Sequence, residues 1–425
     1  MKVLIISANR EEINMRTWPL GAACVAAAAE QSGHDVEFLD LMQVQDPQAA
    51  ASKIIQEFQP QVIGLSVRNV DDQSMADTKF FLCEVKELAL LLKRLANVPI
   101  VLGGAGYSIF PSAMLEYLGS DMGIQVEGEI AFVALIDQLE KREQLVGLPG
   151  LYLPGSKPQA ERLFVKDLDA LPLPGTRFLP DGYLQEGEEF WLPVQTRRGC
   201  PMRCSYCSTA TIEGCVLRKR SPERIVQWMS EWTDLGVRHY HFVDNTFNLP
   251  PSYAKQLCRG LIRAHLSPTW RCIVYQFQVD EELAQLMAEA GCVEASVGFE
   301  SGSALVLSGM NKRFSTEDVR RVCETLGRYG VHRMGFLMLG GPDETKESAV
   351  ESLEFADSLN LECMKVTVGI RIYPYTALAK TAVDEGLISP DDDLLLPRFY
   401  MVHGLDGWLR ETVDQWMSTR PNWTR

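Results

Sequence analysis

Short apolar runs alternate with segments of helical period along the first 145 residues of the chain. Val36 to Leu39, for example, follows a helix-like segment that ends at Gly33. This βαβα alternation predicts a doubly wound parallel sheet covered by helices, and ligands of such sheets bind at the carboxyl ends of the strands. The expected strands are residues 3–6, 36–39, 62–66 and 99–102, and the expected helices include residues 19–31 and 84–96.

A second βα series begins at Trp191 and has clear helix boundaries. Ser221 and Pro222 are typical of an N-cap and a first helical position, and Gly236 is typical of a helix end. Apolar residues at 225, 228, 229, 232 and 235 share one face of that helix. The expected strands are residues 192–197, 239–243, 271–277, 294–299, 333–339 and 364–371. Six βα units are two short of a closed eight-unit barrel, so we expect an open, partial TIM-type barrel with a lateral gap.

These patterns divide the chain into four parts. Residues 1–146 form the first α/β domain, and residues 191–385 form the partial barrel. The segment between them, 147–190, is rich in Pro and Gly and has no sustained period, which predicts a linker packed between the domains. Residues 386–425 are expected to form a short C-terminal cap.

Composition and charge narrow the class of protein. The chain has 425 residues and a formal net charge of −15, and its pI is near 5.0. This acidity argues against an extended nucleic-acid partner, although a local basic patch stays open. The apolar start at Val3 is broken at once by polar residues, and no stretch approaches the length of a membrane span. We therefore expect a cytoplasmic protein with reduced thiols.

Three of the eleven cysteines are clustered, Cys200, Cys204 and Cys207. Intervals of three and two intervening residues allow three thiolates of one loop to converge on a metal centre. The loop follows the first barrel strand, at the rim where such barrels keep their catalytic residues. A zinc knuckle completed by Cys215 is the alternative, but zinc sites usually have a second Cys-x-x-Cys pair, which is missing here.

The Cys-x3-Cys-x2-Cys loop, with Tyr206 just before its third cysteine, resembles that of the radical S-adenosylmethionine (SAM) superfamily. The resemblance implies that Cys200, Cys204 and Cys207 hold a [4Fe–4S] cluster whose fourth iron binds SAM. Reductive cleavage of SAM would then give a 5′-deoxyadenosyl radical. It also implies an electron donor such as a flavodoxin or a ferredoxin.

Residues at the ends of later strands fit the same resemblance as candidate SAM ligands. Asp244 ends the second strand, Glu300 and Ser301 the fourth, and Arg371 the sixth. The alternatives are a helix-capping or salt-bridged role for the carboxylates and a core amide for Gln276. In a later turn, Asp343 stands where the family more often has Gly. The candidate SAM-binding residues are Tyr206, Asp244, Gln276, Glu300, Ser301 and Arg371.

The first domain resembles the cobalamin-binding domain of cobalamin-dependent radical SAM enzymes. The resemblance rests on short pieces such as Trp18–Gly21, Ile63–Ser66 and Val101–Gly104. The cobalt-ligating His of classical cobalamin domains is absent from the loop Ser7–Asn14, and for His34 a turn role is expected. We expect Arg68 and Asn69 to lie under the corrin. The candidate cobalamin-binding residues are Ser66, Arg68, Asn69, Gly103, Gly104, Ala105, Glu127 and Gly128.

Together the two resemblances imply a cobalamin-dependent radical SAM methyltransferase that acts on an unactivated carbon. The radical would abstract a substrate hydrogen, and methylcobalamin would supply the methyl group. A non-methylating cyclase or rearrangement enzyme is the main alternative, and a sensor that never cleaves SAM is another. A methylthiotransferase fits poorly, because the first domain has only Cys24 and Cys83 and no second cysteine cluster. The sequence does not identify the substrate.

Overall fold

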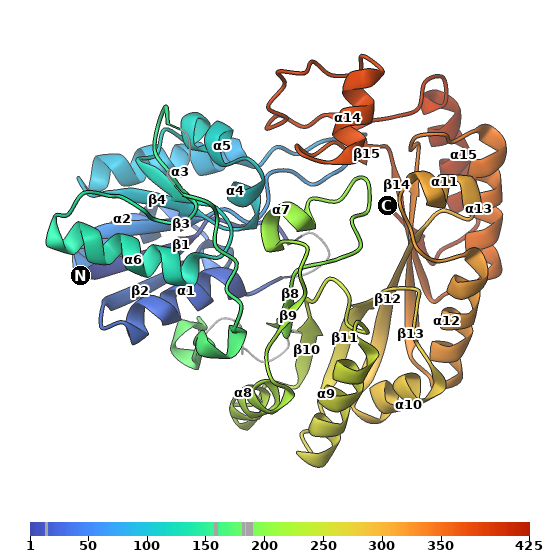
Figure 1. Ribbon diagram of the computed structural model, residues 1–425, viewed down its shortest axis with the longest axis horizontal. Coiled ribbons are helices and arrows are strands. Elements are labelled where there is room, and N and C mark those ends of the chain that lie inside the picture. The colour runs from blue at the N-terminus through green and yellow to red at the C-terminus, as the bar shows by residue number, and fades with distance from the viewer. Residues whose placement is uncertain (13–15, 157–159, 181–182, 184–189) are drawn as a thin grey trace.

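The computed structural model describes residues 1–12, 16–156, 160–180, 183 and 190–425. Two α/β units follow one another along the chain, the first in blue to green and the second in yellow-green to red (Figure 1). Each unit is built around its own mainly parallel sheet. None of the helices in the described ranges has the length and apolar character needed to cross a membrane.

The first sheet has the strand order β2-β1-β3-β4-β5-β6, with β6 antiparallel to β5. Val3 and Ile5 of β1 belong to the core under one layer of helices, and Leu4 and Ile6 to the core under the other. A strand covered on both faces is apolar throughout, which explains the runs in the sequence. The strands are β1 (Lys2–Ser7), β2 (Asp35–Asp40), β3 (Val62–Ser66), β4 (Ile100–Gly103), β5 (Met122–Ile124) and β6 (Leu151–Tyr152).

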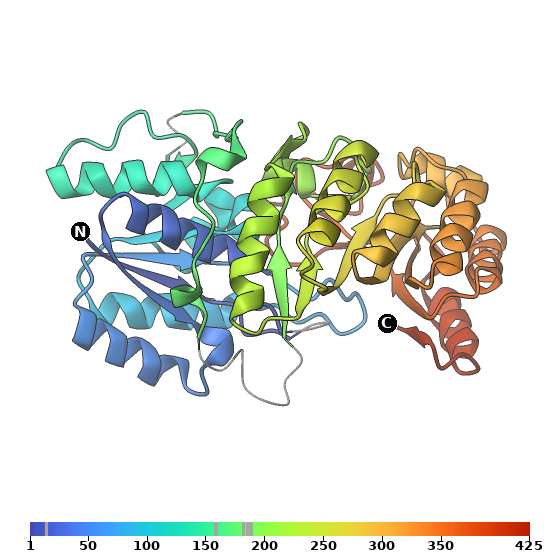
Figure 2. The same cartoon turned by 90° about the horizontal axis from the view of Figure 1, so that it is seen from below.

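Helices cover both faces of this sheet, as the doubly wound prediction requires (Figure 2). The pair α1 (Leu20–Gln31) and α6 (Gly128–Lys141) packs on one face. The other face carries α2 (Pro47–Phe58), α3 (Leu82–Leu95) and α5 (Pro111–Leu118). Because β6 belongs to this sheet, the first domain continues past the predicted boundary at residue 146 into the segment expected to be linker.

The second sheet has seven strands in the order β17-β14-β13-β12-β11-β10-β7 and stays open, since its two edge strands do not pair. All six expected barrel strands are present. The seventh, β17, comes from the segment predicted as a cap and pairs with β14. The strands are β7 (Trp191–Val194), β10 (His239–Phe242), β11 (Thr269–Val274), β12 (Cys292–Glu300), β13 (His332–Leu339), β14 (Cys363–Val368) and β17 (Trp423–Thr424).

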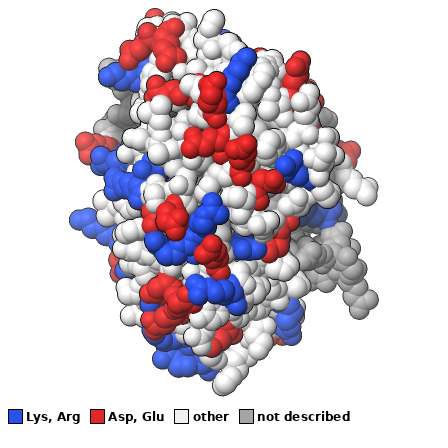
Figure 3. Space-filling view, turned by 90° about the vertical axis from the view of Figure 1, so that its right-hand side faces the viewer, with Lys and Arg blue, Asp and Glu red and all other residues white. Residues whose placement is uncertain are grey.

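Amphipathic helices line the outer side of the barrel sheet (Figure 1). In α8, the predicted face at residues 225, 228, 229 and 232 is buried. Leu235 is 54% exposed instead, because the helix ends at Asp234. On the side of the molecule shown in Figure 3, acidic and basic side chains are interspersed. The barrel helices are α8 (Pro222–Asp234), α9 (Pro251–Arg263), α10 (Glu281–Glu289), α11 (Ala304–Gly309), α12 (Thr316–Arg328) and α13 (Lys346–Ser358).

The segment predicted as the cap, 386–425, divides into two pieces. The first piece carries β16 (Phe399–Tyr400), which pairs with β15 (Ile370–Arg371) and packs with α14 (Ala377–Asp384) into the same core as the first domain. The second piece is α15 (Asp406–Met417), which packs against the barrel before the chain enters β17.

Within the described part of residues 147–190, β6 belongs to the first sheet, and Phe178 and Pro174 contact one unit each. Trp18 of the first domain packs against Trp232 of α8 in a tilted arrangement, with ring centroids 5.4 Å apart. The indole of Trp18 donates to the carbonyl of Phe178 at 2.9 Å, and that of Trp228 donates to the carbonyl of Pro174 at 3.0 Å. The remaining linker residues, 157–159, 181–182 and 184–189, lie outside the described residues.

Candidate cofactor sites and active-site cavity

The cysteine loop leaves the barrel between two short antiparallel strands, β8 (Arg197–Arg198) and β9 (Arg218–Lys219). Gly199 has φ +91, and an added Cβ there would meet the carbonyl oxygen of Val216, so only glycine fits at this turn. The amide of Ser205 donates to the carbonyl of Met310 at 3.1 Å, which ties the middle of the loop to α11. The loop ends in the single turn α7 (Thr209–Glu213).

The three cysteines of the loop form the donor set expected of an iron–sulfur cluster. Cys200, Cys204 and Cys207 are free and half-buried and belong to one loop. Three thiolates from one loop are a typical ligand set of an iron–sulfur cluster, whereas structural zinc sites usually add a second Cys-x-x-Cys pair, which the sequence around Cys215 lacks. The chemistry of the donor set therefore fits an iron–sulfur cluster better than the zinc alternative.

Beside this loop lies a buried triad of Tyr206, Glu300 and Lys312. The Lys312 ammonium is 3.1 Å from Glu300 Oε1 and 3.0 Å from the Tyr206 hydroxyl, which donates to the same carboxylate oxygen at 3.0 Å. Burial raises the pKa of the Cys204 thiol, and the nearby Lys312 opposes this shift. Sequence reasoning found Tyr206 and Glu300 but missed Lys312. In the sequence, the only indication of a role for Lys312 is that it directly follows α11, in the segment Met310-Asn311-Lys312.

Gln276 follows β11 and is 1% exposed. Its amide nitrogen donates to the carbonyl of Val274 at 3.1 Å. Its oxygen is buried without a hydrogen-bond partner in the described structure. Buried acceptors are normally satisfied, so this orphaned oxygen is consistent with a ligand. Gln276 therefore stays among the candidates.

Three other predicted SAM residues already have partners within the protein. Asp244 accepts from the Thr196 amide at 2.8 Å, the Thr196 hydroxyl at 2.6 Å and the Arg197 amide at 3.0 Å, so it holds the strand that leads to the cysteine loop. Ser301 is hydrogen-bonded to Ser352 at 2.9 Å inside a buried turn. Arg371 pairs with Asp71 of the first domain. We do not carry these three into the proposed SAM set.

The glycine-rich turn after β13 contains Asp343, the residue that departs from the family pattern. Asp343 adopts φ +62, a conformation that favours Gly and that Asp tolerates better than most residues. The neighbouring Glu344 carboxylate accepts a short hydrogen bond from the Gly340 amide. Burial raises the pKa of Glu344 to about 7.

A cavity of about 760 Å³ lies between the carboxyl ends of the first sheet and the barrel strands β7, β10 and β11. Its barrel side includes Ser208, Ile212 and Glu213, which directly follow the third cluster cysteine. The short helix α4 (Ala105–Ile109) of the first domain packs against α7 near this wall (Figure 1). All eight candidate cobalamin residues line this one cavity: Ser66, Arg68, Asn69, Gly103, Gly104, Ala105, Glu127 and Gly128.

Glycines shape the wall that β4 contributes. Gly103 has no atom within 4 Å of an added Cβ and lines the cavity, so a side chain there would enter the open space. At Gly104 an added Cβ would instead lie 2.6 Å from the carbonyl oxygen of Val67. At Gly106 it would lie 2.9 Å from that of Arg68. Thus Gly103 leaves room for a ligand, whereas Gly104 and Gly106 let two loops approach each other.

Glu127 and Glu129, at the edge of the cavity, join the two domains through buried ion pairs. Arg218 donates to Glu127 at 2.6 Å, and Arg198 donates to Glu129 at 2.5 Å. Glu127 also accepts from the Val165 amide at 2.7 Å. Because both arginines flank the cysteine loop, these pairs hold the loop and the first domain in fixed relation.

No histidine is among the residues that line the cavity in the described structure. His34 lies just before β2, at the opposite, amino-terminal edge of the sheet, where its Nδ1 is 3.1 Å from the amino group of Met1. Residues 13 and 14 of the loop after β1 lie outside the described residues.

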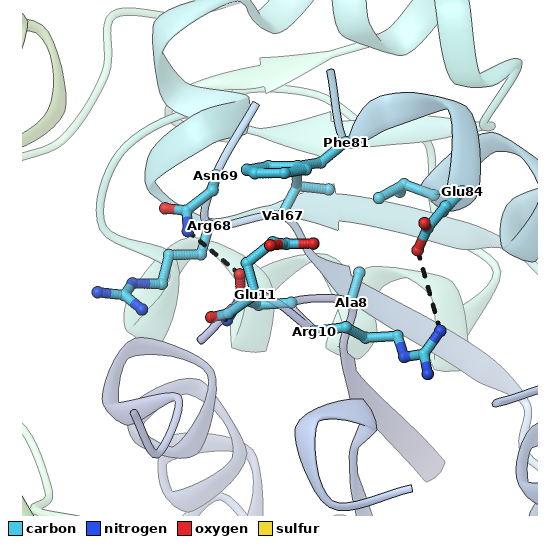
Figure 4. Close-up of a pocket in the computed structure, with 10 residues that line it drawn as sticks. Ala8, Arg10, Glu11, Val67, Arg68, Asn69, Phe81 and Glu84 are labelled. Carbon is cyan, nitrogen blue, oxygen red and sulfur yellow. Dashed lines mark hydrogen bonds and ion pairs between the residues drawn. The ribbon is translucent and has the colours of Figure 1, made fainter. Parts of the chain in front are cut away.

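A smaller pocket lies between the loops after β1 and β3 (Figure 4). Arg68 and Asn69 line both this pocket and the large cavity. The Asn69 amide donates to Asn9 Oδ1 at 3.2 Å, which fixes one loop to the other. Arg68 points away from Phe81 and Glu84 in Figure 4.

Comparison with known proteins agrees with this geometry. Residues 194–356 match the family model of the radical SAM superfamily, and residues 6–136 match that of the B12 binding domain. An uncharacterized methyltransferase of Pyrococcus horikoshii is 28% identical over 91% of this chain and 84% of its own length. A tryptophan 2-C-methyltransferase of Streptomyces laurentii is 24% identical over 89% of this chain and 74% of its own.

A solved structure has the same fold. The radical SAM methyltransferase TsrM from Kitasatospora setae, with cobalamin and a [4Fe–4S] cluster bound, superposes with a TM-score of 0.80 at 23% identity, covering 90% of this chain and 75% of that one. The radical SAM domain implies a [4Fe–4S] cluster and SAM, and the B12 binding domain implies cobalamin, so these are the cofactors of the present chain. With a B12-binding domain ahead of a radical SAM domain, the chain belongs to the cobalamin-dependent radical SAM enzymes.

Proposed function

We propose that this protein is a cobalamin-dependent radical SAM methyltransferase that places a methyl group on an unactivated carbon. One observation carries the proposal: a single cavity joins the predicted cobalamin residues to the end of the cysteine loop. A substrate in that cavity would lie against the predicted cobalamin residues and beside Ser208, the residue after Cys207. Curated relatives named as methyltransferases match most of this chain, which supports the same reaction.

The residues of the barrel would hold the cluster and SAM. Cys200, Cys204 and Cys207 supply the thiolates, and the Tyr206–Glu300–Lys312 triad with Gln276 supplies polar groups for SAM. In this triad the ammonium and the carboxylate are oriented by each other before any ligand arrives, so little reorganisation is needed on binding. When bound, the cluster supplies the electron that cleaves SAM, and cobalamin supplies the methyl group.

The residues of the first domain would hold cobalamin. Ser66, Ala105 and Gly128 would form the wall, and Gly103 would leave the space for the ring. Arg68 and Asn69 are proposed to lie under the corrin, where classical domains have a histidine. Their support is that both line the cavity and that no histidine does so among the described residues.

We also propose that the enzyme works in the cytoplasm with a reduced flavodoxin or ferredoxin as electron donor. All eleven cysteines are free in the structure. Buried thiols without disulfides are typical of a reducing compartment, and a low-potential cluster needs an external donor.

The test does not require the natural substrate. Anaerobically reconstituted protein is incubated with SAM, cobalamin and a reductant, and S-adenosylhomocysteine, methylcobalamin and 5′-deoxyadenosine are quantified. A methyltransferase forms methylcobalamin and S-adenosylhomocysteine and also cleaves SAM reductively. Cleavage to 5′-deoxyadenosine without methylcobalamin would favour the non-methylating alternative. Binding of both cofactors without any SAM turnover would favour a sensor.

A further inference from the structure

A continuous chain of hydrogen bonds runs from one cluster cysteine along the wall of the cavity. Cys207 Sγ is 3.2 Å from the hydroxyl of Thr209, which is 3.3 Å from Asn245 Oδ1. The Asn245 amide donates to Glu213 Oε2 at 2.7 Å. Asn245 and Glu213 line the cavity, and Thr209 is the link between this polar wall and the cysteine.

The Thr209 hydroxyl has a single hydrogen and two acceptors within reach. While Cys207 is a thiol, it donates to Thr209, and Thr209 donates to Asn245. A cysteine that ligates iron is a thiolate, so it has no hydrogen to give and becomes an acceptor. The hydroxyl hydrogen must then turn toward either sulfur or Asn245.

Geometry and charge favour the sulfur. The 3.3 Å separation from Asn245 Oδ1 is long for a hydroxyl–oxygen hydrogen bond, whereas 3.2 Å is short for a contact to the larger sulfur atom. A charged acceptor also makes the stronger bond. Asn245 is only partly buried and faces the cavity, so its oxygen does not depend on Thr209 for a partner.

The neighbours of Thr209 keep the hydroxyl in place. Glu213 accepts from Asn245, from the Gly199 amide at 3.1 Å and from Gln195 at 3.0 Å. The carboxylate thus ties both ends of the cysteine loop to the barrel strands. Thr209 therefore has little freedom to move away from Cys207 when the cluster is assembled.

We propose that Thr209 is a positioning residue that donates its hydroxyl hydrogen to the Cys207 thiolate and thereby raises the reduction potential of the [4Fe–4S] cluster. Hydrogen bonds to the ligating sulfurs stabilise the reduced, more negative cluster. The inference deepens the proposed function, but it depends only on the cluster and not on methyl transfer.

The test is the midpoint potential of the cluster, measured by anaerobic redox titration with electron paramagnetic resonance, together with iron content. Thr209→Val keeps the shape of the side chain and removes the hydroxyl, and Thr209→Ser restores it. Thr211→Val, on the same turn but without contact to a cysteine ligand, is the matched control. We expect a more negative potential in T209V at unchanged iron content, and wild-type values in T209S and T211V.

The proposal fails if T209V keeps the wild-type potential, or if T209S and T211V shift as much as T209V. Should T209V lose the cluster, Thr209→Ala is titrated instead, because the smaller side chain removes the hydroxyl without introducing a new methyl against the loop. A wild-type protein that binds no cluster would overturn the proposed function itself.

Discussion

Arg371 Nε lies 2.9 Å from Asp71 Oδ2, although the two residues are 300 positions apart and belong to different domains. Both side chains are almost completely buried, with 2% and 1% exposure. Arg371 also donates to the carbonyls of Ile372 and Leu394. The pair therefore fastens β15, which follows the sixth barrel strand, to the loop after β3.

Breaking this pair from one side should destabilise the protein strongly. Asp71→Ala or Arg371→Met leaves one buried charge without a partner, and each should lower the free energy of unfolding by about 3–5 kcal/mol. The double variant should lose clearly less than the sum of the two. Chemical denaturation of all four proteins completes the double-mutant cycle, and additive losses would show that the residues do not interact.

Cys204→Ala should abolish both stoichiometric iron binding and formation of 5′-deoxyadenosine, because two thiolates do not hold the cluster. Cys215→Ala is the matched control, since Cys215 is a free, half-buried thiol just beyond the loop. Iron analysis and chromatographic detection of 5′-deoxyadenosine check both variants. Equal loss in C215A would revive the zinc-type alternative.

Gly103→Leu should weaken cobalamin binding while the cluster is retained. The new side chain would project into the cavity, where nothing now lies within 4 Å of an added Cβ. We expect a loss of at least about tenfold in affinity, which corresponds to about 1.4 kcal/mol. Equilibrium dialysis with hydroxocobalamin measures it. Gly407→Ala, an equally open position on α15, is the control, and unchanged binding in G103L would place cobalamin elsewhere.

Lys312→Met should impair SAM binding and cleavage without removing the cluster. The Glu300 carboxylate would lose its cation while it stays buried, so the triad would no longer be oriented. We expect the rate of 5′-deoxyadenosine formation to fall by about 10- to 100-fold, with partial recovery in Lys312→Arg. Lys380→Met, on the surface of α14, should behave as wild type. A K312M variant with normal SAM affinity and turnover would exclude Lys312 from the site.

Glu344 should make stability fall as the pH rises. Burial raises its pKa to about 7 in the folded protein, whereas the carboxyl has its usual value near 4.5 when the chain unfolds. The folded state therefore binds the proton more tightly, and stability declines between about pH 4.5 and 7, by up to about 3 kcal/mol. Glu344→Gln should remove this slope and match the wild type only at low pH. Denaturation at a series of pH values tests this, and parallel curves would contradict it.

Strand positions and the cysteine loop were predictable because both signals are local. A run such as Val3–Ile6 is buried on both faces, and the spacing of Cys200, Cys204 and Cys207 lies within eight residues. The two-residue strand β17 has no period to recognise, and it is held by its pairing with β14. Leu235 shows the same limit of sequence patterns. The apolar period places it on the buried face of the helix, but α8 ends one residue earlier, at Asp234.

Charged residues at strand ends were harder to interpret. From sequence alone, Asp244 and Arg371 resemble ligands, because a carboxylate or guanidinium at the mouth of a barrel is typical of a binding site. Their partners Arg197 and Asp71 are distant in the chain, so only the tertiary structure reveals that their charges are already compensated. Lys312 was missed for the converse reason. Its role follows from Glu300, twelve positions earlier and on another element.

The buried charges across the domain interface limit which domains can be exchanged between related enzymes. A chimera that joins this first domain to the barrel of another enzyme at the linker would separate Glu127 from Arg218, Glu129 from Arg198 and Asp71 from Arg371. Each separation would leave a buried charge without its ion-pair partner and without contact to water. Exchange of whole domains should therefore succeed only when these partners are transplanted together, so the boundary that matters for swapping modules is this set of contacts and not the linker.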